Sequence, residues 1–329
     1  MQWNILASIN AFHFKDQQQF LEREDVIKQR YNMVVEEILK HKPDVVTLQE
    51  VDQAFWDHVS NNCDKFSNMY DWFWACEPKC EKTGKLKYCG RTAVLVKRCD
   101  NFKANKSSAI IYPTSGSKSA TAVRIEWDKD HFVWVASTHL PFIPTNYPAI
   151  AGASAGILKK VADGIMSFER DYGTKDLKLH EHVVLAGDFN MKQQGLPILL
   201  KHLESQDQKV QQYANSLLTP GGQLLHQLHL VLAKAETTPD STETPIKQFG
   251  DGDQDAAKNV PVVTATGSKY TGETIDHVFV PEAFKAAIAE VERMSFEPGH
   301  SYPSLDGKLI GASDHAWLFI KLSNTDIKL

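Results

Sequence analysis

The chain has 329 residues, of which 42% are hydrophobic and 23% charged, and its formal net charge at pH 7 is −5. The hydrophobic content supports a sizeable core, and no apolar stretch approaches the ~20 residues that a membrane-spanning helix needs. The acidic balance argues against indiscriminate nucleic-acid binding, because sequence-independent affinity comes mainly from Lys and Arg side chains. No Pro/Gly/Ser-rich linker divides the chain, so we predict a single domain over residues 1–329.

The pattern of apolar residues predicts alternating strands and helices, as in α/β proteins. Apolar residues at helical spacing predict helices over 23–41 and 149–170, and a further helix begins in 196–203. Residues 236–259 are rich in Thr, Asp, Pro and Gly, which indicates an exposed insertion. The predicted strands lie, in chain order, at 1–6, 44–52, 69–74, 93–97, 109–112, 121–127, 132–140, 183–186, 274–280 and 312–320.

A short polar stretch, Gly187-Asp188-Phe189-Asn190, directly follows the apolar run Val183-Val184-Leu185-Ala186. In an extended backbone Asp188 and Asn190 point to the same face, and Gly187 lets a substrate or another strand approach closely. A carboxylate and a carboxamide at one strand end can hold a divalent metal or orient a nucleophile, and contact a phosphoryl oxygen. The alternative is a simple turn, because Gly, Asp and Asn all favour turns.

Five other predicted strands carry a polar side chain of the same kind near one end. Taken singly, each such residue is typical of a strand cap or a solvated edge. Taken together and in this order, they indicate one constellation of catalytic groups. The residues are Asn4, Glu50, His139, Asp276 and the pair Asp314-His315.

Three motifs in these strands carry a family resemblance. They are Gln2-Trp3-Asn4-Ile5-Leu6-Ala7, Leu48-Gln49-Glu50-Val51-Asp52 and Thr138-His139-Leu140. With residues 187–190, they resemble the endonuclease/exonuclease/phosphatase superfamily over nearly the whole chain, and within it the nocturnin and carbon-catabolite-repressor-type deadenylase families. The resemblance implies a deoxyribonuclease-I-like α/β (α+β) four-layered sandwich, in which two packed mixed β-sheets are flanked by helices. It also implies a magnesium-dependent attack on phosphoesters.

A metal site built from carboxylates follows from the same resemblance. Glu50 is expected to be the principal ligand of Mg²⁺, for which Mn²⁺ can substitute. Asp314 is expected to help bind a second metal ion or to orient His315, and Asp188 to bind metal and position the attacking water. Oxygen ligands suit Mg²⁺, and the absence of a His/Cys cluster at these positions argues against catalytic zinc.

The remaining residues of the constellation receive their roles from the resemblance as well. Asn190 is expected to act with the neighbouring aspartate on the water and the scissile phosphate, and Asn4 to support the metal-bound side. His315 is expected to stabilise the charge that develops on phosphate. Asp276 is the orienting acid of the set, and His139 a phosphate contact.

Several of these positions also admit a purely structural interpretation. Asn4 could satisfy backbone groups at the edge of the first strand, and His139 could be a core histidine with satisfied hydrogen bonds. His277 points to the strand face opposite its neighbour and is expected to play no direct part. The side chain of Asp52 should point to the same strand face as that of Glu50, two positions before it. We expect Asp52 at the rim of the site or just behind the catalytic groups.

The substrate contacts are predicted from a comparison with deadenylases, which hold a terminal adenine between a proline and an aromatic residue. Pro144, shortly after the Thr-His-Leu run, matches the proline, and Tyr270 is a near match for the aromatic residue. Phe142 could share that wall, although Pro-Phe-Ile-Pro could equally make a rigid turn. Nocturnin has a basic pair where this chain has Pro141-Phe142-Ile143, which argues against dinucleotide 2′-phosphatase activity.

The densest basic stretch lies between Lys79 and Arg98 and includes Arg91. In the deadenylase-like families the corresponding loop borders the catalytic cleft, which implies that Arg91 helps to guide a phosphate. The alternative for the whole stretch is a solvated hairpin.

The chain has five cysteines, and no secretory signal precedes the first predicted strand. An odd number indicates reduced thiols, so we expect an intracellular, cytoplasmic protein, unless an N-terminal targeting extension is missing from the sequence. A structural zinc is the alternative, because four cysteines crowd together, although not at the spacing of a zinc ribbon. These four are Cys76, Cys80, Cys89 and Cys99.

The resulting hypothesis is a Mg²⁺-dependent 3′-to-5′ exoribonuclease that acts on single-stranded RNA ends. One alternative is a phosphatase or phosphodiesterase that uses the same metal site on a small nucleotide, an inositol phosphate or a phospholipid. The Pro-x-x-Cys-Asp-Arg signature of the lipid and inositol-phosphate enzymes is missing around residues 272–276. The other alternative is a non-catalytic interaction module, which the retained constellation argues against.

Overall fold

The structure is a computed structural model of the chain. No helix in the part of the chain that it describes has the length and apolar character needed to span a bilayer. The described residues are 1–5, 7, 23–74, 91–104, 110–113, 119–127, 131–141, 147–172, 177, 179–190, 276–281, 284, 288–293, 304–305, 308–309 and 318–322.

The first sheet has six strands in the order β11-β14-β1-β2-β4-β3. Strands β1 and β2 run parallel, with Asn4 beside Gln49, and the other neighbours are antiparallel. The sheet therefore joins strands from both ends of the sequence. Its strands are β1 (Gln2–Asn4), β2 (Val45–Val51), β3 (Tyr70–Trp74), β4 (Arg91–Lys97), β11 (Ile288–Arg293) and β14 (Leu318–Leu322).

The second sheet has the order β10-β9-β8-β7-β5, and β6 also pairs with β7. Strands β8 and β9 run parallel, and the other neighbours are antiparallel. A separate hairpin joins β12 (Ser304–Leu305) and β13 (Lys308–Leu309). The strands of the second sheet are β5 (Lys103–Ala104), β6 (Ile110–Pro113), β7 (Ser119–Glu126), β8 (Phe132–His139), β9 (Val183–Asp188) and β10 (Asp276–Phe279).

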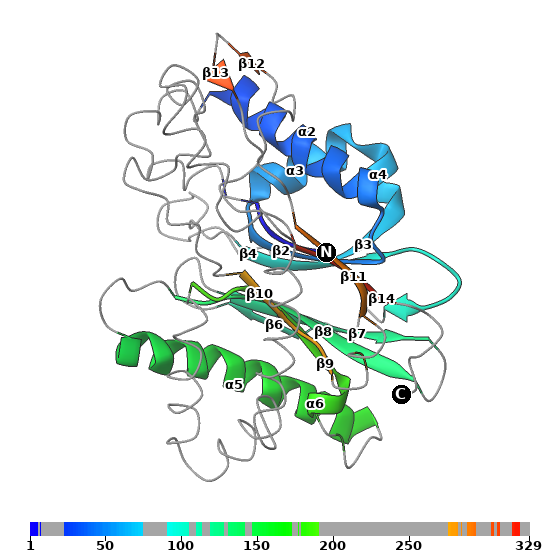
Figure 1. Ribbon diagram of the computed structural model, residues 1–329, viewed down its shortest axis with the longest axis vertical. Helices are drawn as coiled ribbons and strands as arrows, with labels where there is room; N and C mark the ends of the chain where they lie inside the picture. Colours follow the sequence, from blue (N-terminus) through cyan, green and yellow to red (C-terminus); the bar gives the residue numbers. More distant parts are fainter. Residues whose placement is uncertain are drawn as a thin grey trace.

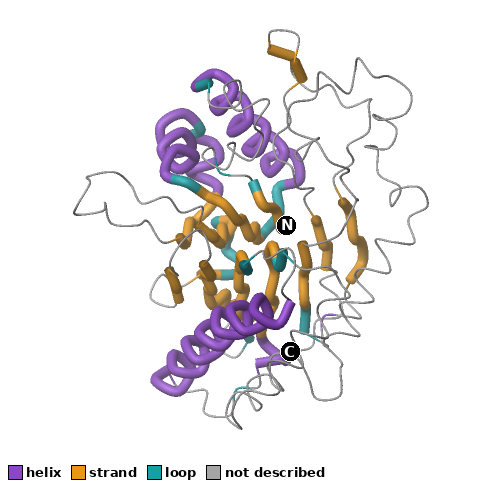
Figure 2. The backbone as a smooth tube through the Cα atoms, turned by 90° about the vertical axis from the view of Figure 1, so that its left-hand side faces the viewer, coloured by secondary structure: helices purple, strands orange, loops and turns teal. Residues whose placement is uncertain are grey.

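Helices cover the outer face of each sheet, which gives the predicted four layers (Figure 1). Figure 2, turned by 90°, shows the same order of layers, with strands in the middle and helices on both outer sides. Helices α2, α3 and α4 lie on the first sheet, and α5 and α6 lie on the second. The helices are α2 (Glu24–His41), α3 (Gln53–Asn62), α4 (Asp64–Met69), α5 (Tyr147–Tyr172) and α6 (Leu179–His182).

Helix α2 shows why these segments are helical. Its first turn is acidic and its last turn basic, which suits the helix dipole at both ends. Val26, Val34 and Ile38 repeat at helical spacing and are buried, so one face of α2 packs against the first sheet. Lys42 ends the helix in a left-handed conformation with φ of 48°.

Two apolar clusters of described residues lie between layers of the fold, and β4 contributes to both. Ala93 and Leu95 face the helices, whereas Val94 and Val96 face the second sheet. Successive side chains of a strand point to opposite faces, so burial on both faces requires a continuous apolar run. The sequence of β4 has that character.

The predicted helices and the strands that lie in the described residues are confirmed, with ends shifted by a few residues. β14 spans Leu318–Leu322, and the first six residues of the strand predicted at 312–320 lie outside the described residues. The predicted helix at 196–203 and the insertion at 236–259 lie outside the described residues.

Candidate active site

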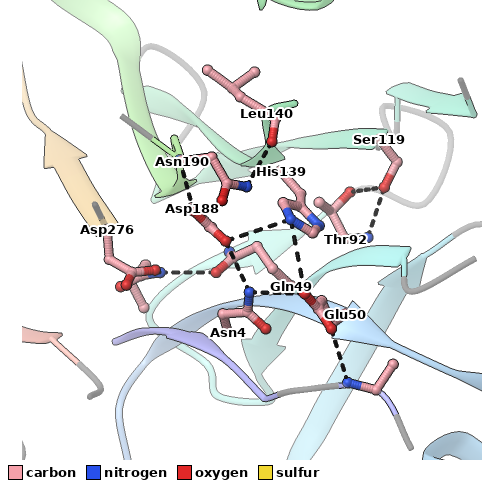
Figure 3. A network of polar contacts seen from close by, with 12 residues as sticks. Asn4, Gln49, Glu50, Thr92, Ser119, His139, Leu140, Asp188, Asn190 and Asp276 are labelled. Carbon is pink, nitrogen blue, oxygen red and sulfur yellow. Dashed lines mark hydrogen bonds and ion pairs between the residues drawn. The ribbon is translucent and has the colours of Figure 1, made fainter. Parts of the chain in front are cut away.

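The carboxyl ends of four central strands, two from each sheet, meet at one edge of the sandwich. β1 ends at Asn4 and β8 at His139, while β2 carries Glu50 near its end and β9 ends at Asp188. Asp276, at the start of the antiparallel strand β10, stands opposite the last residue of β9. Figure 3 shows these side chains pointing toward one another from both sheets. The fold therefore gathers groups that are far apart in the sequence.

A β-bulge directs Glu50 into this cluster. The pairing of β2 with β4 shifts between Leu48 and Val51, and Glu50 has a positive φ of 59°. A bulge changes the direction of a side chain, and here Glu50 is only 8% exposed at the site. The backbone N–H of Ala7 donates to Glu50 Oε2 over 3.1 Å, which fixes one oxygen of the carboxylate.

Asn4 connects the carboxylates of the two sheets. Its Nδ2 donates to Glu50 Oε1 over 3.3 Å and to Asp188 Oδ2 over 2.9 Å. All three side chains are buried. A neutral amide that donates to two anions offsets part of their mutual repulsion without taking up a proton. The interpretation of Asn4 as a strand-edge residue that satisfies backbone groups does not describe these contacts.

His139 faces the same two carboxylates. Its Nε2 lies 3.4 Å from Asp188 Oδ2 and 3.9 Å from Glu50 Oε1, and the residue is 2% exposed. His139 therefore lies inside the polar cluster and not in an apolar core. Its ring can place an N–H, or a positive charge when protonated, against either acid.

Gly187 makes this arrangement possible. It has φ of 154°, and a Cβ atom there would lie 1.9 Å from the carbonyl oxygen of Thr138 on the neighbouring strand. Of the two expected partners for a close approach to Gly187, a substrate or another strand, the structure shows the neighbouring strand β8. Because β8 and β9 pair in register, with His139 beside Asp188, this approach fixes the relative position of both residues.

We expect Gly187→Ala to lower the free energy of unfolding by roughly 2–6 kcal/mol, the sum of an overpacking cost and a backbone-strain cost. Thermal unfolding measures the loss. Gly156→Ala is the matched control, because a Cβ atom at this helical position meets no atom within 4 Å. The control should be neutral or stabilising by about 0.5–1 kcal/mol. Equal stability of the two variants would contradict the close approach.

Asn190 corrects the prediction of a continuous extended segment. It lies beyond the end of β9 and has φ of 50°. Its backbone N–H donates to Asp188 Oδ1 over 2.7 Å, and its Nδ2 donates to the carbonyl of Leu140 over 2.8 Å. The alternative prediction, a turn, therefore describes the backbone here. The turn also holds the Asp188 carboxylate in place, so a turn at this position is compatible with the predicted role of Asp188.

A chain of amides beside the carboxylates was not predicted. Gln2 Nε2 donates to Gln49 Oε1 over 2.8 Å and to Asp276 Oδ1 over 2.9 Å. Gln49 Nε2 in turn donates to Ser137 Oγ over 3.0 Å. A usable signal existed for Gln2, because it lies two residues before Asn4 and so shares its strand face.

A buried cluster of hydroxyl groups, formed by Thr92, Ser119 and Thr121, lies opposite the bulge. The backbone N–H of Thr92 donates to Ser119 Oγ over 2.9 Å, and the Thr92 hydroxyl lies 3.0 Å from that of Thr121. These contacts cross from β4 to β7. The second sheet therefore satisfies a backbone group of β4 next to the irregular pairing.

Three further predictions have clear outcomes. Asp52 is not a rim residue: its carboxylate caps α3 by accepting from the N–H of Phe55 over 2.7 Å, and it also accepts from the Tyr31 hydroxyl over 3.0 Å. His277 packs edge-on against Phe189 at 5.5 Å between ring centroids, away from the carboxylates, as expected. Arg91 is the first residue of β4 and is 3% exposed, so it lies in a strand and not in the loop expected for it.

The described end of the basic stretch fits the solvated alternative. Lys97 pairs with Asp44 over 3.1 Å, and Arg98 pairs with Asp71 over 3.0 Å. Both lie at or beyond the end of β4 that is remote from Glu50. Five predicted site residues lie outside the described residues. They are Phe142, Pro144, Tyr270, Asp314 and His315.

Cysteines 63 and 99, the two that lie in described segments, are free thiols. Burial raises the pKa of the Cys63 thiol, and nearby Asp64 adds to this effect, so the thiol is a weaker nucleophile than an exposed one. The alternative of a structural zinc concerns three further cysteines, Cys76, Cys80 and Cys89, which lie outside the described residues.

The donor set suits a hard divalent cation. Glu50 and Asp188 present carboxylate oxygens beside an amide and an imidazole, which is the chemistry expected for Mg²⁺ or Mn²⁺. In the described segments no three His, Cys, Asp or Glu residues converge into a complete metal site. Both carboxylates already accept a hydrogen bond at each oxygen, and the contact from Asn4 to Glu50, at 3.3 Å, is longer than its contact to Asp188, at 2.9 Å.

Comparison with known proteins identifies the family of the chain. The sequence profile of the Endonuclease/Exonuclease/phosphatase family matches residues 1–315. No curated protein sequence matches the chain. The human nocturnin catalytic domain with bound sulfate aligns with a TM-score of 0.50 and 18% identity, over 98% of this chain and 91% of that one.

Two other solved structures align less well. D. rerio TDP2 complexed with a single-strand DNA product has a TM-score of 0.48 and 12% identity, over 98% of this chain and 97% of that one. ANGEL2, a 2′,3′-cyclic phosphatase, has a TM-score of 0.40 and 19% identity, over 58% and 52% of the two chains.

The family assignment rests on the profile, which covers more than half of the chain, and the alignment with nocturnin supports the fold. The four layers and the two mixed sheets agree with that fold. Members of the family generally depend on a divalent metal for phosphoester hydrolysis. The chain belongs to the endonuclease/exonuclease/phosphatase family and is a phosphoesterase with the deoxyribonuclease-I-like fold.

Proposed function

We propose that this phosphoesterase is a Mg²⁺-dependent 3′-to-5′ exoribonuclease that acts on single-stranded RNA. The observation that carries the chemistry is the cluster in which Asn4 donates to both Glu50 and Asp188 while His139 faces the same two acids. The proposed RNA substrate comes from the motifs that resemble the nocturnin and deadenylase families.

Each residue of the cluster has a proposed role. Glu50 holds the metal ion, which supplies Lewis-acid stabilisation of the phosphate when bound. Asp188 accepts a hydrogen bond from the attacking water and orients it, because an ionised carboxylate only accepts. His139 directs its ring N–H toward the charge that develops on the phosphoryl oxygens. Asp276 is an orienting acid, Asp314 orients His315 or helps to bind a second metal ion, and His315 stabilises the charge that develops on the phosphate.

Asn4 and Asn190 act mainly through position. Asn4 keeps the two carboxylates at hydrogen-bonding distance from one amide, which prevents them from moving apart under their mutual repulsion. Asn190 fixes the strand end, because its backbone N–H holds Asp188 Oδ1 and its side chain holds the Leu140 carbonyl. Preorganisation of this kind removes reorganisation from the chemical step.

A panel of substrates tests the reaction class. The purified chain is incubated with oligo(A), other homopolymers, dinucleotide phosphates and phospholipid headgroups, with Mg²⁺ or with EDTA. We expect shortening of RNA from the 3′ end, loss of activity in EDTA, and recovery with Mg²⁺ or Mn²⁺. Full activity in EDTA would contradict the mechanism. Cleavage of small phosphoesters alone would leave the phosphoesterase assignment intact and reject RNA as the substrate.

Base preference tests the proposed substrate wall of Pro144, Phe142 and Tyr270. Stacking contributes about 1–3 kcal/mol per base, roughly 5- to 150-fold, and tolerates any base. Tyr270→Ala should therefore raise KM and weaken a preference for adenine while leaving kcat close to wild type. Steady-state kinetics on oligo(A) and oligo(U) separate the two effects. An unchanged KM would remove Tyr270 from the substrate site.

A further inference from the structure

Strand β1 presents two amide side chains to the second sheet. Gln2 and Asn4 are two residues apart, so both point toward the same face. Asn4 Nδ2 donates to Asp188 Oδ2 over 2.9 Å, and Gln2 Nε2 donates to Asp276 Oδ1 over 2.9 Å. Each amide thus donates a hydrogen bond to one acid of the second sheet.

These two acids form a cross-strand pair. Asp188 on β9 and Asp276 on β10 stand directly opposite each other in an antiparallel ladder. Like charges in this relation repel, and they would turn their carboxylates apart unless donors hold them. The donors come from β1, which contacts both strands. Gln2 is therefore placed to compensate Asp276 in the way that Asn4 compensates Asp188.

The orientation of the Gln2 amide is set by its neighbours. The Ser137 hydroxyl donates to the carbonyl of Leu48 over 2.9 Å, so its oxygen is left to accept from Gln49 Nε2 over 3.0 Å. This places Gln49 Oε1 toward Gln2, which must then present its NH₂ group at 2.8 Å. The second N–H of that group points at Asp276. The chain of hydrogen bonds therefore permits only one orientation of the Gln2 amide, with its NH₂ group toward Gln49 and Asp276.

Burial makes Gln2 an unusual choice for packing alone. The side chain is 1% exposed, and its Oε1 has no hydrogen-bond partner in the described part of the chain. An apolar residue of the same length would avoid that unsatisfied oxygen. The polar contacts of Gln2 are made by its side-chain nitrogen, which donates to Gln49 and to Asp276.

We propose that Gln2 is a positioning residue that fixes the carboxylate of Asp276 for phosphoester hydrolysis. The inference rests on the proposed function, since it assumes that Asp276 takes part in the reaction. Gln2 touches neither substrate nor metal in this scheme. It acts through Asp276, and Gln49 and Ser137 set its direction.

The test is a double-mutant cycle with Gln2→Met and Asp276→Asn. Methionine keeps the length of the side chain and removes both donors. We expect Gln2→Met to lower kcat about 10- to 100-fold, as loss of a supporting hydrogen bond does, with KM changed less than about 3-fold and Tm unchanged or raised. In the Asp276→Asn background the same change should lower kcat by less than about 2-fold, because the partner is already lost.

Two further variants sharpen the result. Gln2→Glu is close to isosteric and sets a negative charge against Asp276, so kcat should fall further than in Gln2→Met. It also serves as the probe if Gln2→Met does not fold. Gln53→Met is the matched control, since Gln53 Nε2 donates to the Asp57 carboxylate over 2.7 Å on the exposed surface. Its kcat should equal that of wild type.

The outcomes separate the two proposals. A wild type that hydrolyses no phosphoester rejects the proposed function, and the positioning role of Gln2 with it. An active wild type in which Gln2→Met lowers kcat equally in both backgrounds overturns the positioning role alone. An effect confined to KM, or to Tm, does the same.

Discussion

Replacement of Asp188 with Asn should lower kcat by about 10²–10⁴-fold, the range for loss of a group that handles a proton in the reaction. Two donors reach this carboxylate, Asn4 Nδ2 and the Asn190 backbone N–H, and His139 Nε2 lies 3.4 Å from its Oδ2. An amide must turn its NH₂ group toward at least one of them. It also loses the charge that orients the water.

The same substitution should lower the free energy of unfolding by about 1–3 kcal/mol, because a buried donor is left unsatisfied. The kinetic effect must therefore be measured well below Tm, on protein shown to be folded by circular dichroism. Asp52→Asn is the matched control, since Asp52 also accepts from a backbone N–H and a side chain but lies at the start of α3. It should lower Tm without a change in kcat. Equal losses of kcat in both variants would point to a general effect on stability.

Local patterns were sufficient to predict most elements. The helix over 23–41 repeats apolar residues on one face, and the all-apolar run of β4 indicates a strand that is buried on both faces. The helices α3 and α4 were not predicted. Their sequence is largely polar, and their stability comes from packing of Phe55, Val59 and Phe66 under the first sheet and from the Asp52 cap.

The residues of the candidate site could be named from the sequence, but their geometry could not. Asn4, Glu50 and His139 each lie within a predicted strand and Asp188 lies just after one, which is a local signal. The bulge at Glu50 has no such signal, because a positive φ at a glutamate is imposed by pairing with β4 and by contacts across the sheets. The regular extended conformation that local propensity favours would point the Glu50 carboxylate in a different direction.

Contacts between the sheets explain the other omissions. Gln2 and Gln49 lie in β1 and β2, while their partners Ser137 and Asp276 lie in the second sheet. The register of one sheet over the other depends on how the two apolar faces pack, and no single strand encodes it. The expected loop position of Arg91 was wrong for a related reason, since Arg91 begins β4 and its side chain is buried between neighbouring elements.

Replacement of Glu50 with Gln is expected to separate chemistry from stability. A neutral amide is a weaker metal ligand than a carboxylate, so we expect activity to fall on the order of 100-fold or more and the Mg²⁺ concentration for half-maximal activity to rise about 10-fold or more. The free energy of unfolding should change by less than about 1 kcal/mol. Loss of the 3.3 Å bond from Asn4 is offset by relief of repulsion between the carboxylates of residues 50 and 188.

Glu169→Gln gives the matched control for that experiment. Glu169 is 1% exposed on α5, and its Oε1 accepts from Arg124 Nε over 2.9 Å and from Trp134 Nε1 over 2.8 Å. Removal of this charge should lower the free energy of unfolding by about 1–3 kcal/mol and leave kcat and the Mg²⁺ dependence unchanged. Mg²⁺ titrations of activity and thermal unfolding of both variants give the comparison. If the Glu50→Gln variant keeps the Mg²⁺ dependence of wild type, Glu50 does not hold the metal. The two variants would then differ only in their effect on stability, as expected for two acids that do not bind metal.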